Sequence, residues 1–275
     1  MASSPTPSDT PVPLPTPDGV YREVSLPILM YHYISAPPPD ADAIRRDLSL
    51  PLEAFEAQLR YFQEAGYHSI TFYDLVMYLQ RGAPLPAKPI LFTFDDGYKD
   101  HFTNAFPLLR KYGFRGTFFL ITGFLDEGRP GHLTWQDVET MSAAGMEFGA
   151  HSYTHPDLRG QTVDYIVWQT LGPKQAIELR TGTPVVAFCY PFGRYDEQIV
   201  AVARSAHYWV GVMIQQGLRH TSANLFKIRR VRVRGTDSVE DLVRRIEYLR
   251  VLELTPTPAV VGLPQATSRT PVALP

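Results

Sequence analysis

The amino-acid sequence predicts an α/β protein, a distorted (β/α) barrel of about seven parallel strands. Short apolar runs of strand length alternate about seven times with amphipathic stretches of helix length, and this alternation is typical of a parallel sheet covered by helices. The chain has 275 residues, of which 44% are hydrophobic, enough for one large core or two small ones. At this length a closed or nearly closed barrel is favoured, and a doubly wound open sheet is the alternative.

Both ends of the chain are rich in proline, threonine and serine. Residues 1–22 and 255–275 carry few large apolar side chains, so a disordered N-terminal arm and a disordered C-terminal tail are expected. The folded unit should therefore span residues 23–254. Because such segments commonly tether extracellular domains, an extracellular or envelope location is favoured. The first residues lack the basic and apolar regions of a signal peptide, so a removed signal and a cytosolic start both stay open.

Apolar periodicity and helix-ending residues define the first half of the folded unit. Phe55, Leu59 and Phe62 repeat at helical spacing, Thr71 can cap a helix, and Gly113 is a typical helix terminator. The largely apolar run PILFTF instead predicts a buried strand. The expected elements are a strand over residues 26–33, helices over 52–65 and 73–80, a strand over 89–94, a helix over 101–112 and a strand over 117–121.

Capping signals also define the second half. Thr134 and Asp137 have the spacing of a capping box, Gly145 can end that helix, and Thr162 can cap a long helix that Pro173 would bend. The expected elements are a helix over residues 134–144, a strand over 147–150, a helix over 162–180, a strand over 185–189, a helix over 196–206, strands over 208–213 and 228–233, and a helix over 239–249.

Charge and cysteine content exclude several classes of partner and site. The net charge is −2, and the one basic run, residues 227–234, is interleaved with isoleucine and valine. Neither nucleic acid nor an anionic membrane is therefore expected as a partner. No stretch reaches the ~18 apolar residues of a membrane span. The single cysteine, Cys189, excludes an intrachain disulfide, and because it ends an apolar run it is interpreted as a buried structural residue.

Two of the predicted strand ends carry residues suited to metal chemistry. Asp95 and Asp96 follow the buried strand over 89–94, where two adjacent carboxylates are costly unless a cation neutralises them. His151 and His155 follow the strand over 147–150, and Pro156 disfavours a helix there. Each motif alone is as well explained by a polar turn or by surface histidines. Together, two histidines and one aspartate are a ligand set typical of a catalytic zinc or similar ion.

A third strand end carries a rigid turn. The sequence Tyr190-Pro191-Phe192-Gly193 would leave backbone amides exposed, and such amides can stabilise an oxyanion. A simple turn is the alternative.

These three motifs in this order resemble the polysaccharide deacetylase family, also called the NodB-homology or carbohydrate esterase 4 family. The similarity extends over most of the folded unit. The opening Leu29-Met30-Tyr31-His32, together with Trp135, resembles the branch that acts on poly-N-acetylglucosamine and related envelope glycans.

The resemblance implies a role for each matching residue. Asp96, His151 and His155 would bind a divalent metal, usually zinc, with cobalt or nickel as substitutes. Asp95 would be the general base that activates water, and the Phe192 amide, in the wall formed with Tyr190 and Pro191, would bind the oxyanion.

The chain departs from the family pattern at two positions. An arginine that usually orients the catalytic aspartate is replaced by Cys189, and the usual C-terminal histidine acid has no clear counterpart. Alternation in the strand over 228–233 places Arg230 and Arg232 on one face, which is either a solvent face or a catalytic one. We predict that Arg230 points into the site and tethers Asp95. His32 could replace the missing acid, although a structural role is favoured.

The sequence therefore predicts a metal-dependent hydrolase that removes N-acetyl groups from an amino-sugar polymer and releases acetate. An O-acetyl esterase of the xylan type and a non-catalytic glycan-binding module are the alternatives. The expected partner is an N-acetylated glycan polymer, and the chain is expected to be monomeric.

Overall fold

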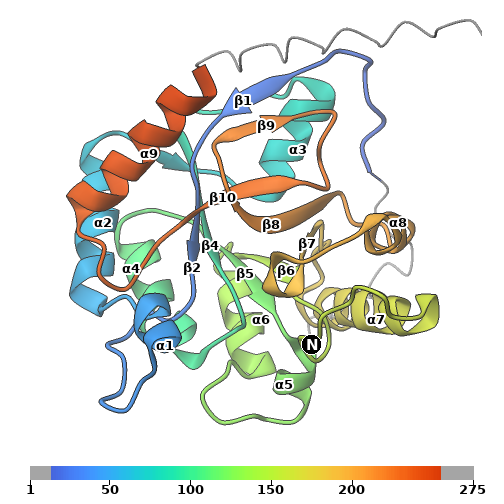
Figure 1. Cartoon of the computed structure of the whole chain (residues 1–275), viewed down its shortest axis with the longest axis horizontal. Coiled ribbons are helices and arrows are strands. Elements are labelled where there is room, and N and C mark those ends of the chain that lie inside the picture. The colour runs from blue at the N-terminus through green and yellow to red at the C-terminus, as the bar shows by residue number, and fades with distance from the viewer. Residues whose placement is uncertain (1–13, 255–275) are drawn as a thin grey trace, which may run out of the picture.

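The computed structural model describes residues 14–254 and contains a closed parallel barrel (Figure 1). Its strands are β2 (Ile28–Tyr31), β4 (Pro89–Phe94), β5 (Thr117–Leu120), β6 (Glu147–Ala150), β7 (Ala187–Cys189), β8 (Val210–Gln216) and β10 (Ile228–Arg232). They neighbour one another in the order β2-β10-β8-β7-β6-β5-β4, and pairing between β4 and β2 closes the ring. The predicted barrel of seven parallel strands is confirmed.

Three short strands lie outside this ring, and the sequence analysis did not predict them. Strand β3 (His68–Ser69) pairs with the start of β4. Strands β1 (Glu23–Ser25) and β9 (Arg219–Thr221) form an antiparallel ribbon beside β8 and β10 (Figure 1). Each has two or three residues, too few to show an apolar alternation.

Helices surround the barrel in Figure 1. They are α1 (Ala43–Leu48), α2 (Leu52–Glu64), α3 (Phe72–Arg81), α4 (Phe106–Lys111), α5 (Thr122–Asp126), α6 (Trp135–Ala143), α7 (Val163–Thr181), α8 (Glu197–Ser205) and α9 (Val239–Leu254). The predicted caps are present, because Thr71 and Thr134 each form a capping box with the aspartate three residues later. No helix within residues 14–254 is long and apolar enough to cross a membrane.

One predicted helix differs in an informative way. The segment expected as a single α-helix over 101–112 begins as a π-helix, His101–Ala105, and only then continues as α4. Pro107 explains the change, since it has no N–H to donate and its ring crowds the carbonyl four residues before it. The wider turn begins five residues after Asp96 of the site.

Side chains of β4 alternate between two environments. Phe94 stacks on Phe118 of β5 with a centroid distance of 4.7 Å, and on Tyr31 of β2 at 5.2 Å. Thr93 and Asp95 point the other way, toward Arg230 of β10. Because side chains of a strand alternate in direction, one face of β4 builds the core and the other builds the site.

Residues 14–22, which lie in the predicted arm, contact helix α3. The Asp18 amide donates to the Gln80 carbonyl at 3.1 Å, and Arg81 donates to the Thr16 carbonyl at 3.0 Å. The rest of the predicted arm, residues 1–13, and the predicted tail, residues 255–275, lie outside the described residues.

Candidate metal centre and catalytic site

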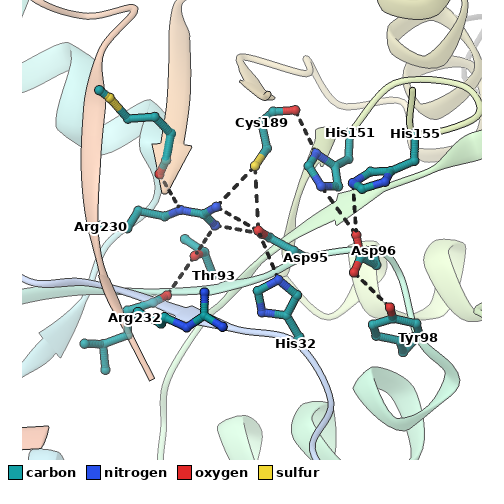
Figure 2. A network of polar contacts seen from close by, with 12 residues as sticks. His32, Thr93, Asp95, Asp96, Tyr98, His151, His155, Cys189, Arg230 and Arg232 are labelled. Carbon is teal, nitrogen blue, oxygen red and sulfur yellow. Dashed lines mark hydrogen bonds and ion pairs between the residues drawn. The ribbon is translucent and has the colours of Figure 1, made fainter. Parts of the chain in front are cut away.

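The predicted site residues meet at the carboxyl ends of the barrel strands (Figure 2). Asp95 and Asp96 follow β4, and His151 follows β6. Cys189 ends β7, and Arg230 lies on β10. Since all seven strands are parallel, their carboxyl ends lie on the same side of the barrel, and segments far apart in the sequence meet there.

Asp96, His151 and His155 form a compact group of candidate metal ligands. One ligand atom from each lies within 4.8 Å of those of the other two. The Asp96 Oδ1 atom is 3.4 Å from His151 Nε2 and 3.7 Å from His155 Nε2. His151 Nδ1 donates to the Cys189 carbonyl at 2.7 Å, so Nε2 is the nitrogen that faces Asp96 and would bind a metal. Two imidazoles and one carboxylate are a donor set that fits zinc, cobalt or nickel.

Protonation of Asp96 and His155 suits a cation. Burial would lower the pKa of His151, but Cys189, Asp96 and Asp95 raise it well above its ordinary value, so a metal would displace the proton from its Nε2. Burial would raise the pKa of Asp96, but the hydrogen bond with His151 and the neighbouring imidazoles hold the pKa far below its ordinary value. Burial and the charge of His151 lower the pKa of His155 to about 4. Asp96 is therefore ionised and His155 is neutral near pH 7, the forms in which both bind metals.

Strained backbone concentrates at this site. Within residues 14–254, six non-glycine residues have a positive φ, and four of them are Asp96 at 75°, Ser152 at 66°, His155 at 59° and Phe192 at 57°. Such a conformation costs of the order of 1 kcal/mol per residue and persists only where the surroundings enforce it. The loop between the two histidines must therefore be held from outside.

Gln169 of α7 supplies that restraint. Its side chain is fully buried, and its Oε1 accepts from the Tyr153 amide at 2.9 Å and the Thr154 amide at 3.0 Å. Its Nε2 donates to Thr154 Oγ1 at 2.8 Å and to the Tyr165 hydroxyl at 3.1 Å. The sequence analysis missed Gln169, because a glutamine on an amphipathic helix carries no local signal of burial.

Asp95 is bound by Arg230 in the two-bond geometry of a guanidinium on a carboxylate. Nη1 and Nη2 of Arg230 each donate to one Asp95 oxygen at 2.7 Å. Arg230 is fully buried, and it also donates to the Met213 carbonyl and to Thr93 Oγ1, both at 3.1 Å. Burial would raise the pKa of Asp95, but the charge and hydrogen bonds of Arg230 lower it. The structure thus places Arg230 where the tether was predicted.

Cys189 lies beside this pair and is fully buried, as the sequence predicted. Its Sγ is 3.3 Å from Arg230 Nη2 and 3.7 Å from Asp95 Oδ2. The small thiol leaves the space that the guanidinium from β10 fills. The guanidinium thus reaches Asp95 from β10, whereas the resemblance implied an arginine at the position of Cys189 on β7.

His32 lies closer to the reacting groups than its predicted structural role implies. It follows β2, and its Nε2 lies 3.9 Å from Asp95 Oδ2 (Figure 2). Its backbone carbonyl is 2.5 Å from Nε2 of the fully buried His101, which is the first residue of the π-helix. Burial lowers the pKa of His32 more than Asp95 and Asp96 raise it. The sequence analysis assigned no role to His101.

Tyr98 is a second contact that the sequence did not reveal. Its hydroxyl donates to Asp96 Oδ2 at 2.9 Å, so Asp96 keeps Oδ1 directed at the histidines. The Tyr98 ring stacks on Tyr33 with centroids 3.6 Å apart. Its position two residues after Asp96 was the available signal.

The predicted oxyanion wall divides into two parts. Phe192 lies at the rim, 49% exposed, with its ring centroid 4.5 Å from that of His155. Tyr190 and Pro191 are buried, and the Tyr190 hydroxyl donates to the Phe226 carbonyl at 3.1 Å. Only Phe192 therefore lies beside the metal ligands.

Comparison with known proteins agrees with this arrangement. The sequence model of the family described as "polysaccharide deacetylase" matches residues 82–211. The Bacillus subtilis protein YxkH, which is assigned to the polysaccharide deacetylases, is 30% identical over 212 residues, covering 77% of this chain and 72% of YxkH. The chain belongs to the polysaccharide deacetylase family. The matched range contains both aspartates and both histidines, whereas His32 and Arg230 of this polysaccharide deacetylase lie outside it.

Solved structures show the same fold. A Streptococcus pyogenes deacetylase, PplD, solved in complex with acetate, has a TM-score of 0.76 and 29% identity, covering 82% of this polysaccharide deacetylase and 99% of PplD. A polysaccharide deacetylase from Bacillus cereus has a TM-score of 0.72 at 29% identity, and the match covers 82% of this chain and 69% of the Bacillus cereus chain. The poly-β-1,6-N-acetyl-D-glucosamine N-deacetylase of Escherichia coli K12 is 22% identical, and the match covers 75% of this chain but 37% of that enzyme.

Proposed function

We propose that this polysaccharide deacetylase hydrolyses N-acetyl groups of an amino-sugar polysaccharide in a metal-dependent reaction that releases acetate. The observation that carries the proposal is the ionised, arginine-bound Asp95 adjacent to the Asp96, His151 and His155 group. A protein that only binds glycan needs no second buried carboxylate there. The relatives that are poly-N-acetylglucosamine N-deacetylases support the choice of an amide substrate.

Asp96, His151 and His155 would hold the metal. When bound, a divalent ion supplies Lewis acidity toward the acetyl carbonyl and lowers the pKa of water. The contribution of the chain is to keep Asp96 ionised and to fix the proton of His151 on Nδ1 through the Cys189 carbonyl. Zinc is the proposed ion, with cobalt or nickel as alternatives.

Asp95 would accept the proton from the attacking water. Arg230 holds the carboxylate in place and keeps it ionised, because the lowered pKa leaves it charged near pH 7. The same contacts weaken Asp95 as a base, so the water must itself be made more acidic. This requirement agrees with a metal centre beside it.

His32 would pass to the departing amine the proton that Asp95 takes from water, because its lowered pKa leaves its own ring neutral near pH 7. Among residues 14–254 it is the imidazole that lies near Asp95 and is not one of the candidate metal ligands. The Phe192 ring lies at the rim beside His155, so the backbone amide of Phe192 would be the group that stabilises the oxyanion.

We further propose that the protein acts at the cell envelope or outside the cell.

Acetate release tests the proposal. The chain would be freed of metal with a chelator and then assayed on β-linked N-acetylglucosamine oligomers and on acetylated xylan, before and after addition of zinc or cobalt. We expect metal-dependent release from the amide substrate and a loss of about 10²- to 10⁴-fold with Asp95→Asn. Release from acetylated xylan alone would indicate an O-acetyl esterase. Glycan binding without any release would indicate a binding module.

A further inference from the structure

The barrel has a hollow on its outer side, where β8 is connected to β10. Every other connection between consecutive strands of the described barrel contains a helix, but this one contains only β9 and loops (Figure 1). The hollow has a volume of about 400 Å³, within the range of small-molecule sites. Residues of β8, β9 and β10 line it, together with Tyr21 and Tyr195.

Two buried polar side chains in this lining lack partners. His220 is 2% exposed and Thr221 is 9% exposed. His220 Nε2 pairs with the Leu26 carbonyl at 3.2 Å, but His220 Nδ1 and Thr221 Oγ1 have no hydrogen-bond partner within the described chain. Buried polar atoms without partners are rare in folded proteins, so these two indicate a polar group that the hollow receives from outside.

The charge of the lining has one sign. It contains three cationic side chains and no carboxylate. Arg219 is neutralised by Glu23 at 2.5 Å, and Lys227 is paired more loosely with Glu197 at 3.3 Å. Arg229 forms no ion pair within residues 14–254 and lies close enough to His220 to lower its pKa. An anion is the group that an unpaired, half-buried guanidinium would bind.

Aromatic and amide groups complete the lining. The exposed ring of Tyr21 and the half-buried ring of Tyr195 offer apolar faces, while Gln215 and Asn224 offer donors and acceptors. Rings beside amides suit a sugar, which combines apolar C–H faces with hydroxyl groups. We propose that this hollow is a second binding site, separate from the metal centre, for a sugar unit that carries a carboxylate or a phosphate group.

Calorimetric titration tests the site without using turnover. The full chain would be titrated with glucuronate and glucose 6-phosphate, with glucose as neutral probe and inorganic phosphate as the anion alone, and again after chelator treatment. We expect both acidic sugars to bind with a Kd below about 1 mM, more weakly at high salt, and equally with or without chelator. Glucose should bind at least about tenfold more weakly.

Three variants assign the contacts. Arg229→Gln should weaken both acidic sugars about tenfold or more, because it removes a charge-assisted hydrogen bond. Arg60→Gln, an exposed arginine of α2, is the matched control and should change nothing. Tyr21→Ala alters an exposed side chain, and it should weaken glucose 6-phosphate but not inorganic phosphate.

Other outcomes would overturn the proposal. Equal affinity in the native chain and Arg229→Gln, or binding abolished by chelator treatment, would place the ligand elsewhere. Inorganic phosphate binding as tightly as glucose 6-phosphate would remove the sugar from the assignment. Absence of binding to every probe would refute the second binding site and would not bear on the proposed deacetylase function.

Discussion

Asp95 and Arg230 are two opposite charges almost completely withdrawn from water, each held by at least two hydrogen bonds. Such a pair contributes little net stability, but removing one partner alone leaves an uncompensated buried charge. Its value here is geometric, because two parallel bonds fix the plane of the carboxylate that faces the substrate.

Substitution of Arg230 should separate charge from geometry. Arg230→Lys keeps the positive charge but loses the planar pair of donors. We expect kcat to fall about 10- to 100-fold with little change in KM, since a misplaced base affects the chemical step. Arg230→Met should also lower the free energy of unfolding by about 3 kcal/mol or more.

Steady-state kinetics together with urea denaturation would measure both effects. Arg232→Lys is the matched control, because Arg232 is a half-buried arginine of the same strand that pairs with Asp47. A fully active Arg230→Met enzyme would show that Arg230 is not needed to orient Asp95.

His220 makes the fold sensitive to acid. Burial and the charge of Arg229 lower the pKa of His220 from 6.5 to about 4, although the Leu26 carbonyl raises it in part. The folded state therefore favours the neutral ring, so this stability is fully present above pH ~6.5 and is lost as the pH falls toward 4, about 3 kcal/mol in all. Thermal melting between pH 7 and 4 should show a smaller decline for His220→Gln. Parallel curves for the two proteins would refute this assignment.

At the scale of elements, parallel strands and helix-capping residues could be predicted from sequence. PILFTF is apolar at every position except Thr93, and Thr134 with Asp137 marks a helix start locally, so both elements were placed correctly. The contacts of Gln169 with the metal loop and of His101 with the His32 carbonyl were not predictable. Each of these contacts joins residues that are distant in the sequence. Nothing in the local sequence distinguishes a glutamine that binds a loop from one that faces water.

Gln169 should control metal affinity rather than catalysis as such. In Gln169→Ala, the Tyr153 and Thr154 amides lose their acceptor, and the strained turn that carries His155 loses its restraint. We expect metal affinity to fall about 10- to 100-fold, the effect typical of residues that orient ligands. Competition with a chromogenic chelator measures it directly. Gln136→Ala, on the exposed face of α6, should bind metal normally; unchanged affinity in Gln169→Ala would contradict the role.

For the whole molecule, the closed barrel explains why so few local motifs sufficed to predict the site. Once seven strands are parallel, motifs at their ends must converge, and the aspartates and histidines did so. The connection from β8 to β10 through β9 was not predictable, because β9 is too short to be recognised from sequence.

Metal binding should stabilise the entire fold. The three candidate ligands follow β4 and β6 and are brought together only in the folded chain. A metal at about 100 times its Kd would add ~2.7 kcal/mol, or about 5–10 °C in Tm for a domain of this size. Differential scanning calorimetry with and without chelator would show the shift. His155→Ala should melt at the same temperature in both conditions, and a native chain insensitive to chelator would contradict metal binding.

Helix α7 contacts two parts of the candidate catalytic site. Gln169 holds the loop of His155, and one and a half turns later Lys174 donates to the Val185 carbonyl at 2.5 Å, just before the strand that ends at Cys189. The helix thus sets the distance between the loop that carries His155 and the strand whose Cys189 carbonyl orients His151. Inserting one residue between positions 169 and 174 would rotate one contact by about 100° relative to the other. The number of residues between Gln169 and Lys174 is therefore fixed by the need to keep both contacts.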